Sequence, residues 1–154
     1  MIIRQESVDS KSALKDLPST SPLPNANLVL VFSSVKRFSE GKLQGFLKTR
    51  YPTAQVVGCT TSGEISADGV YDDSIQITAV QWEKTVQRVA QTKMSGMQNS
   101  FEAAAGLAKQ LKAESLRTVI VISDGLNVNG SELLKGFQSV LGDIPIVGGL
   151  AGDG

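Results

Sequence analysis

Two continuous apolar runs, which lie ninety residues apart, constrain the fold of this chain more than any other feature. They belong to the predicted strands at residues 28–32 and 118–122, and in the second strand the apolar residues follow Thr118. Runs of this length without polar alternation are typical of strands buried on both faces, as in parallel sheets covered by helices. A serine-containing turn and a segment with helical spacing follow each run. The sequence therefore predicts an α/β fold.

The other elements follow from the spacing of apolar residues. Helices are predicted at 9–17, 39–50, 98–112 and 131–141, and strands at 54–58, 74–82, 85–93 and 145–147. Ser39 is the expected N-cap of the second helix. Glu83-Lys84 is the expected turn of a hairpin between the strands at 74–82 and 85–93, although it lacks the favoured turn residues.

The sequence of the first half aligns with that of the second half without a gap when it is shifted by ninety positions. Val31 falls on Val121, Ser33 on Ser123, and the glycine at 58 on the glycine at 148. The order of elements also matches, which predicts two pseudo-repeated βαβ-type halves, residues 1–82 and 83–154, within a single module. We expect a mixed, largely parallel buried sheet that is flanked by helices.

The two halves differ at their ends, because the first continues from its glycine-rich loop into the strand at 74–82 and the second stops at residue 154. This difference predicts that the chain is a C-terminally truncated part of a longer protein. Exposed sheet edges recruit further strands, so a homodimer formed through the truncated edge is a further expectation.

Composition excludes several classes of function. The chain has no histidine and one cysteine, which removes Ser-His-Asp and Cys-His catalysis and the common haem and zinc ligand sets, so no metal and no cofactor are expected. Fifteen basic residues balance fifteen acidic residues, which gives no field for nucleic acid or anionic lipid. The sequence shows no signal peptide and no membrane span, and we expect a cytoplasmic location.

Polar turns and glycine-rich loops follow the predicted strands, and ligands of α/β proteins bind at the carboxyl ends of strands. The candidate ligand-binding residues are Ser33, Cys59, Thr60, Thr61, Ser62, Gly63, Glu64, Ser123, Asp124, Gly148, Gly149, Gly152 and Asp153. Backbone N–H groups of such loops would bind a carboxylate, and Glu64 would bind an ammonium group.

Each candidate also has a structural interpretation. The segment from Thr60 to Glu64 is also compatible with a polar turn followed by a cap. Asp124 is also compatible with a residue that accepts hydrogen bonds within its own turn. Cys59 is either a reactive thiol or a packed one. Asp68, Asp72 and Asp73 are expected to be solvated loop residues.

The segments at 28–34, 51–65, 123–126 and 145–154 together resemble the FIST family, a sensory module of bacterial and archaeal signalling proteins. The resemblance implies the N-terminal FIST module, an input domain without catalytic activity that binds amino-acid-like ligands. Its output partners would be a histidine kinase, a cyclic-dinucleotide enzyme such as a diguanylate cyclase, or a chemotaxis receptor. Some members of the family sense nitric oxide through a haem whose ligand is a histidine. This sequence contains no histidine, which argues against that role here.

Two other functions stay open from the residues alone. One is a hydrolase-like or transferase-like enzyme that uses Cys59 or a serine at the carboxyl ends of the strands as nucleophile. Such an enzyme would need an activating base. The other is an interaction scaffold, in which the loops bind no ligand.

Overall fold

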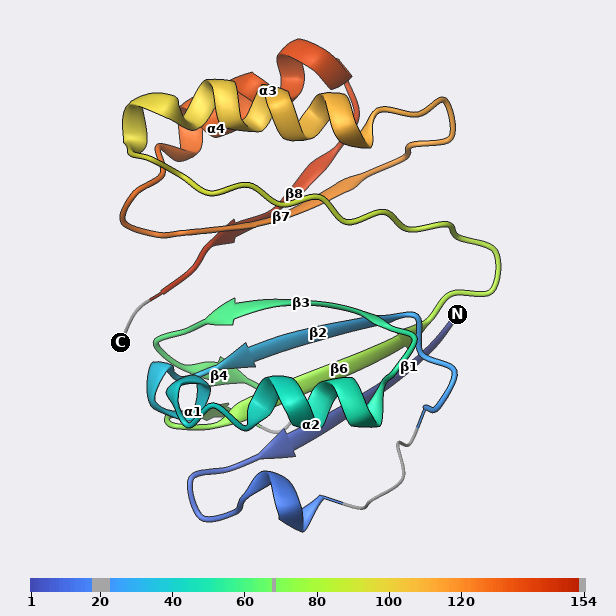
Figure 1. Cartoon of the computed structure of the whole chain (residues 1–154), viewed down its shortest axis with the longest axis vertical. Coiled ribbons are helices and arrows are strands. Elements are labelled where there is room, and N and C mark those ends of the chain that lie inside the picture. Colours follow the sequence, from blue (N-terminus) through green and yellow to red (C-terminus); the bar gives the residue numbers. More distant parts are fainter. Residues whose placement is uncertain (18–22, 68, 153–154) are drawn as a thin grey trace. The chain divides into compact units, whose positions relative to one another are not determined.

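The computed structural model describes residues 1–17, 23–67 and 69–152. The described residues form two compact units: Met1–Val86 together with Gly152, and Gln87–Ala151. The helices and strands of both units are labelled in Figure 1.

A mixed four-stranded sheet forms the centre of the first unit. Its strands, in spatial order, are β1 (Ile2–Val8), β6 (Ile75–Gln81), β2 (Leu28–Ser33) and β3 (Gln55–Thr60). β2 pairs with β3 in parallel, and β6 runs antiparallel to both β1 and β2. The prediction of a mixed α/β sheet is confirmed, and the parallel pairing within this sheet is confined to β2 and β3.

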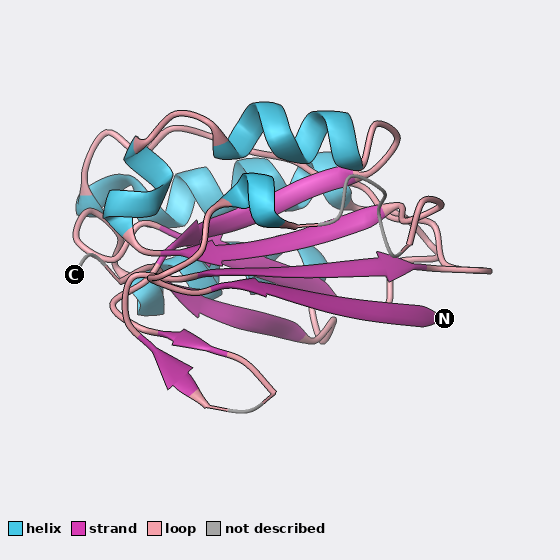
Figure 2. Cartoon of the chain, turned by 90° about the horizontal axis from the view of Figure 1, so that it is seen from below, coloured by secondary structure: helices cyan, strands magenta, loops and turns pink. Residues whose placement is uncertain are grey.

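Short elements complete the first unit. They are the 3-10 turn η1 (Leu14–Asp16), the helices α1 (Val35–Ser39) and α2 (Leu43–Arg50), and the hairpin strands β4 (Glu64–Ile65) and β5 (Val70–Tyr71). The β4–β5 hairpin forms a small separate sheet (Figure 2).

The single helix predicted at 39–50 is wrong, because the chain forms α1 and α2 instead. Gly41 adopts a positive φ of 71° between them, a conformation that interrupts a helix. Ser39 is therefore the last residue of α1 and not an N-cap. The N-cap of α1 is Ser34, whose hydroxyl accepts a hydrogen bond from the Arg37 N–H at 3.2 Å.

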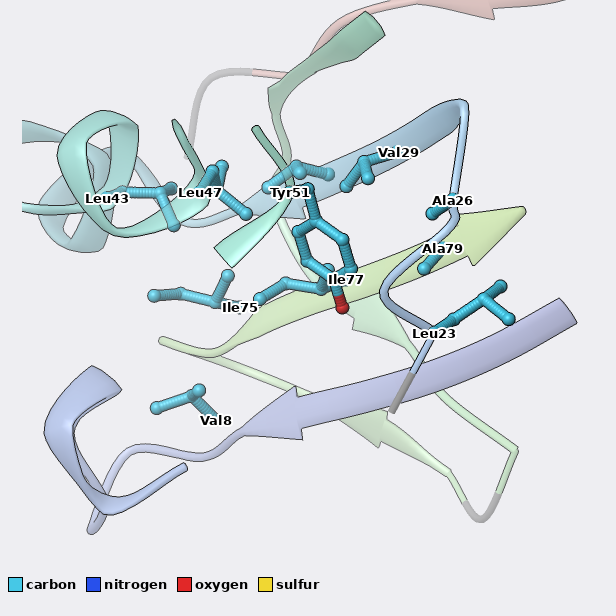
Figure 3. Close-up of a cluster of buried hydrophobic side chains, with 11 residues drawn as sticks. Val8, Leu23, Ala26, Val29, Leu43, Leu47, Tyr51, Ile75, Ile77 and Ala79 are labelled. Carbon is cyan, nitrogen blue, oxygen red and sulfur yellow. The ribbon is translucent and has the colours of Figure 1, made fainter. Parts of the chain in front are cut away.

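The core of the first unit lies between one face of the sheet and α2 (Figure 3). Val29, Ile77 and Ala79 are fully buried on that face, and Leu47 and Tyr51 pack against them. Alternate residues of β2 and β6 supply this face, which is the arrangement expected of strands with one face on a helix.

The second unit contains a parallel pair of strands covered by helices. Its elements are η2 (Met97–Asn99), α3 (Ser100–Leu111), β7 (Val119–Ser123), α4 (Gly130–Leu141) and β8 (Ile146–Leu150). A Cβ on Gly136 of α4 would lie 2.3 Å from the Phe101 carbonyl oxygen of α3, so glycine permits the two helices to touch. Val119 of β7 and Phe137 of α4 are buried in the core of this unit.

The predicted hairpin of strands 74–82 and 85–93 is wrong. No strand lies within the described stretch 83–96, and β6 pairs with β1 instead. β1 escaped prediction because Arg4, Gln5 and Glu6 interrupt its apolar residues. The loop expected after residue 147 also begins later, since Gly148 and Gly149 belong to β8.

The two parallel pairs share one register. Val31 pairs with Gly58 across β2 and β3, and Val121 pairs with Gly148 across β7 and β8. A Cβ on either glycine would lie within 1.9 Å of the carbonyl oxygen of its partner valine, so both positions require glycine. This agreement supports the ninety-residue offset, and the duplication itself stays a prediction.

Candidate functional site

Polar residues gather at the carboxyl ends of β2 and β3 in the first unit. The Thr61 N–H donates to the Ser33 carbonyl oxygen at 3.0 Å, which carries the parallel pairing one residue beyond β3. The chain then passes through Ser62 and Gly63 into β4, which begins at Glu64. The structure thus brings together six residues that the sequence predicted for this rim: Ser33, Thr60, Thr61, Ser62, Gly63 and Glu64.

The Glu64 carboxylate is buried and is fully engaged within the protein. Its side chain accepts from the Thr61 hydroxyl at 2.6 Å on Oε1. On Oε2 it accepts from both the N–H and the hydroxyl of Ser74, at 2.9 and 2.8 Å. These contacts anchor β4 to the start of β6, and they leave Glu64 poorly placed to bind a ligand ammonium group.

A chain of buried polar side chains continues from Glu64 into the sheet. The Gln76 amide donates from Nε2 to the Ser74 hydroxyl at 3.2 Å and to the Ser7 hydroxyl at 2.7 Å. Gln76 Oε1 is buried and has no hydrogen-bond partner among the described residues. Ser33 is also buried, and its hydroxyl donates to the Ser34 carbonyl oxygen. Ser74 and Gln76 were not predicted, because residues ten and twelve positions from Glu64 show no local pattern in the sequence.

The last residue of β3 and the loop that follows it hold several hydrogen-bonding groups that stay free. Within the described part of the chain, the hydroxyls of Thr60 and Ser62 and the backbone N–H groups of Ser62 and Gly63 make no hydrogen bond. Asp72 is close to this loop, since its Oδ1 lies 3.7 Å from the position that a Cβ would have on Gly63. The Asp72 carboxylate is exposed and forms neither a hydrogen bond nor an ion pair with another described residue.

Cys59 is part of the same strand but faces the other side of the sheet from Thr60, because side chains alternate along a strand. It pairs with Phe32 in the register of β2 and β3 and is partly buried. Burial raises the pKa of the Cys59 thiol. A raised pKa lowers the thiolate fraction, which is the opposite of what a nucleophilic cysteine needs.

Asp73 belongs to an ion-pair cluster that the sequence did not reveal. Its carboxylate accepts from Lys36 Nζ at 2.7 Å and from the Ser34 hydroxyl at 3.1 Å, and Arg37 Nε lies 3.5 Å away. The hydrogen bond from Lys36 is the main cause that holds the pKa of Asp73 below its ordinary value. Asp73 is thus a partly exposed loop residue as expected, but its ion pairs also tie the loop between β5 and β6 to α1. Asp68 lies outside the described residues.

The second group of predicted residues comprises Ser123, Asp124, Gly148, Gly149, Gly152 and Asp153, and of these Ser123 ends β7 and Asp124 follows it in the second unit. Asp124 accepts from the N–H groups of Leu126 and Asn127 on Oδ1 and from Asn127 Nδ2 on Oδ2. The Asn127 side chain is the main cause that lowers the pKa of Asp124. Asp124 thus stabilises its own turn, which was the structural interpretation of this residue.

The other members of that group have different environments. The Ser123 hydroxyl is buried and has no partner in the described part of the chain. Gly148 and Gly149 are strand residues of β8. Gly152 belongs to the first unit, where a Cβ on it would lie 2.8 Å from Ser62 Oγ. Asp153 lies outside the described residues.

The described residues contain no group of three or more His, Cys, Asp or Glu side chains that could hold a metal ion. No helix in the described ranges has the length and apolarity that a membrane span requires.

Comparison with known proteins gives one match. No curated protein and no solved structure is similar enough to this chain to count as a match. The model of the FIST N domain matches residues 27–154, which is most of the chain and includes the polar rim of the first unit. The chain therefore belongs to the FIST family, whose domain is a sensory domain associated with signal transduction.

Proposed function

We propose that this chain is the input module of a signal-transduction protein and that it binds a small amino-acid-like molecule at the loop between β3 and β4. The FIST N domain match over residues 27–154 carries this proposal. The loop adds a chemical argument, because its free hydrogen-bond donors lie close to the free carboxylate of Asp72.

The donors of the loop suit the carboxylate of a ligand. The free N–H groups of Ser62 and Gly63 and the hydroxyls of Thr60 and Ser62 are on three nearby residues. Backbone N–H groups that have no internal partner bind anionic oxygens well, and such bonds are stronger than those between neutral groups.

Asp72 suits the ammonium group of the same ligand. Its Oδ1 is close to Gly63, and no other described residue neutralises its charge. Glu64, which the sequence favoured for this role, already accepts three hydrogen bonds. A ligand with an α-amino and an α-carboxylate group would therefore meet a complement to each group close to Gly63.

Ligand analogues test this proposal directly. The whole chain would be titrated calorimetrically with a panel of L-amino acids, with their amides, which lack the carboxylate, and with the acids that lack the amino group. We expect an amino acid to bind and both analogues to bind more weakly. In a thermal shift, ligand at a hundred times its Kd would add about 2.7 kcal/mol to the free energy of unfolding. Folded protein that binds no member of the panel would contradict the proposal.

A single isosteric substitution localises the site. Asp72→Asn removes the negative charge and should weaken amino-acid binding about tenfold or more, the effect of roughly 1.4 kcal/mol. Asp143→Asn is the matched control, because Asp143 is also exposed and lies in the second unit. Equal affinity of the Asp72→Asn variant and the unaltered chain would place the ligand elsewhere.

We further propose that the output partner is a histidine kinase, a diguanylate cyclase or a chemotaxis receptor, and that the module works in the cytoplasm. The family's association with signal transduction supports the first statement. The single cysteine, which can form no internal disulfide, supports the second. Co-purification of each partner class with and without the amino acid identified above would test the output.

A further inference from the structure

The first unit contains a cavity that shares no lining residue with the loop between β3 and β4. Its volume is about 350 Å³, at the small end of the range that ligand sites occupy. The lining comes from η1 and the residue before it, from α1 and the joint between α1 and α2, and from the start of β6. Segments that are distant in the sequence therefore build it.

The apolar lining of the cavity is continuous with the core of the first unit. Ile75 of β6 is 2% exposed and belongs to that core (Figure 3). Leu14 of η1 packs against the same core. The turn of η1 is closed by the Asp16 carboxylate, which accepts from the Ala13 N–H at 2.7 Å. An apolar ligand group in the cavity would thus contact aliphatic side chains that packing already holds in place.

Arg37 of α1 forms a fixed wall of the cavity. Its Nη2 donates to the Asp9 carbonyl oxygen at 2.7 Å, and its Nε donates to the Asp73 carbonyl oxygen at 3.2 Å. The carboxylates of Asp73 and Glu40 balance its charge, at 3.5 and 4.0 Å. Glu40 is the one acidic side chain among the described lining residues, so its pairing with Arg37 leaves the net charge of the cavity to other residues.

Two lysines give the exposed side of the cavity an unbalanced positive charge. Lys15 belongs to η1 and Lys42 to the joint between α1 and α2, and both are exposed. Neither ammonium group forms an ion pair or a hydrogen bond with another described residue. Lys42 is also the N-cap residue of α2, whose first turn contains no acidic residue, so the positive end of the helix adds to this charge.

We propose that this cavity binds a small aliphatic monocarboxylate, with its apolar chain against Leu14 and Ile75 and its carboxylate toward Lys15 and Lys42. Burial of the chain supplies most of the affinity, and the two lysines select an anion and set its orientation. The ligand differs from the one proposed for the loop between β3 and β4, because no unpaired carboxylate in the described lining would bind an ammonium group. The two proposals stand on different residues, so each is tested separately.

A series of simple carboxylates tests the cavity. The whole chain would be titrated calorimetrically with butanoate, hexanoate and octanoate, and with octylammonium, which has the chain of octanoate and the opposite charge. Each further CH2 group that is buried should strengthen binding about fourfold. Octylammonium should bind roughly tenfold more weakly than octanoate, or not at all. Absence of saturable octanoate binding, equal binding of octylammonium, or an affinity that does not rise with chain length would overturn the proposal.

Substitution of the lysines tests the assigned orientation. Lys15→Gln and Lys42→Gln each remove one exposed charge, and each should weaken octanoate binding about threefold, with a smaller effect at high salt. Lys48→Gln in α2 is the matched control, because Lys48 is also exposed and does not line the cavity. Octanoate that binds both lysine variants as tightly as the unaltered chain would contradict the proposal.

Amide chemical shifts in NMR spectra of the whole chain locate the bound octanoate. We expect the largest changes at Lys15 and Lys42. Changes centred on Ser62 and Gly63 would place octanoate at the loop between β3 and β4 and would overturn the cavity site. The amino-acid titration is judged by its own ligands, so it can succeed or fail whichever result octanoate gives.

Discussion

Glu64 should contribute more to the stability of the first unit than any exposed acidic residue, because its carboxylate is buried and accepts three hydrogen bonds. Glu64→Ala leaves the N–H and the hydroxyl of Ser74 without their acceptor, and Ser74 is fully buried. An unsatisfied buried donor costs about 1–3 kcal/mol, so leaving both donors unsatisfied should lower the free energy of unfolding by about 2–6 kcal/mol.

Glu64→Gln separates the acceptor role from the charge. The carbonyl oxygen of the new amide can still accept from Ser74, and its NH2 group can donate to the Thr61 hydroxyl, which rotates to accept. Each hydrogen bond then loses its charge assistance, and we expect a smaller loss of about 1–2 kcal/mol. The order of stability should therefore be Glu, then Gln, then Ala.

Urea unfolding followed by tryptophan fluorescence measures this order. Trp82 is the single tryptophan of the chain and belongs to the first unit, so its emission reports on the unit that contains Glu64. Glu40→Ala is the control, since Glu40 is exposed and its ion-pair partner, Arg37, is 4.0 Å away. If Glu64→Ala unfolds within about 0.5 kcal/mol of the unaltered chain, as a typical surface substitution does, the anchoring role is refuted.

Three further predictions concern single residues of the first unit. Burial raises the pKa of Cys59, so iodoacetamide should alkylate it more slowly at neutral pH than it alkylates free cysteine, and a faster rate in mass spectrometry would contradict this. The hydrogen bond from Lys36 lowers the pKa of Asp73, so Asp73 stabilises the fold above its unfolded pKa of about 3.9 and loses this effect as pH falls through the folded pKa. Asp73→Asn should therefore lower the urea midpoint at pH 7 but not in strong acid, where an undiminished difference would argue against the ion pair. Gly58→Ala should lower the Tm measured by circular dichroism sharply, because the new Cβ would lie 1.9 Å from the Val31 carbonyl oxygen of β2. Gly45→Ala in α2 is the control and should not lower the Tm, because no atom lies within 4 Å of the Cβ position.

Continuous apolar runs in the sequence correctly predicted strands whose side chains contribute to the two cores. The elements that the sequence analysis missed form because of contacts with distant parts of the chain. β2 and β7 appear where continuous apolar residues predicted them. β1 carries polar residues on both faces, and it forms a strand because β6 offers an unpaired side. Local patterns contain no information about a partner that lies some seventy residues away along the chain.

The same limit applies to the rim. The sequence correctly indicated which residues follow β2 and β3, since strand ends can be read from apolar runs. It could not indicate which polar groups are already satisfied, because the partner of Glu64 is Ser74, at the start of a different strand. Ion pairs such as that of Asp73 with Lys36 likewise depend on how a loop and a helix meet.

Two carboxylates near the loop therefore have different environments, and this difference decides how the proposed ligand binding should be tested. Glu64 is buried and bound within the protein, whereas Asp72 is exposed and free among the described residues. Replacing Glu64 would weaken binding by loosening β4 from β6, whether or not Glu64 ever touches a ligand. Replacing Asp72 leaves every hydrogen bond of the described network intact, so a loss of affinity in that variant reports on the ligand itself.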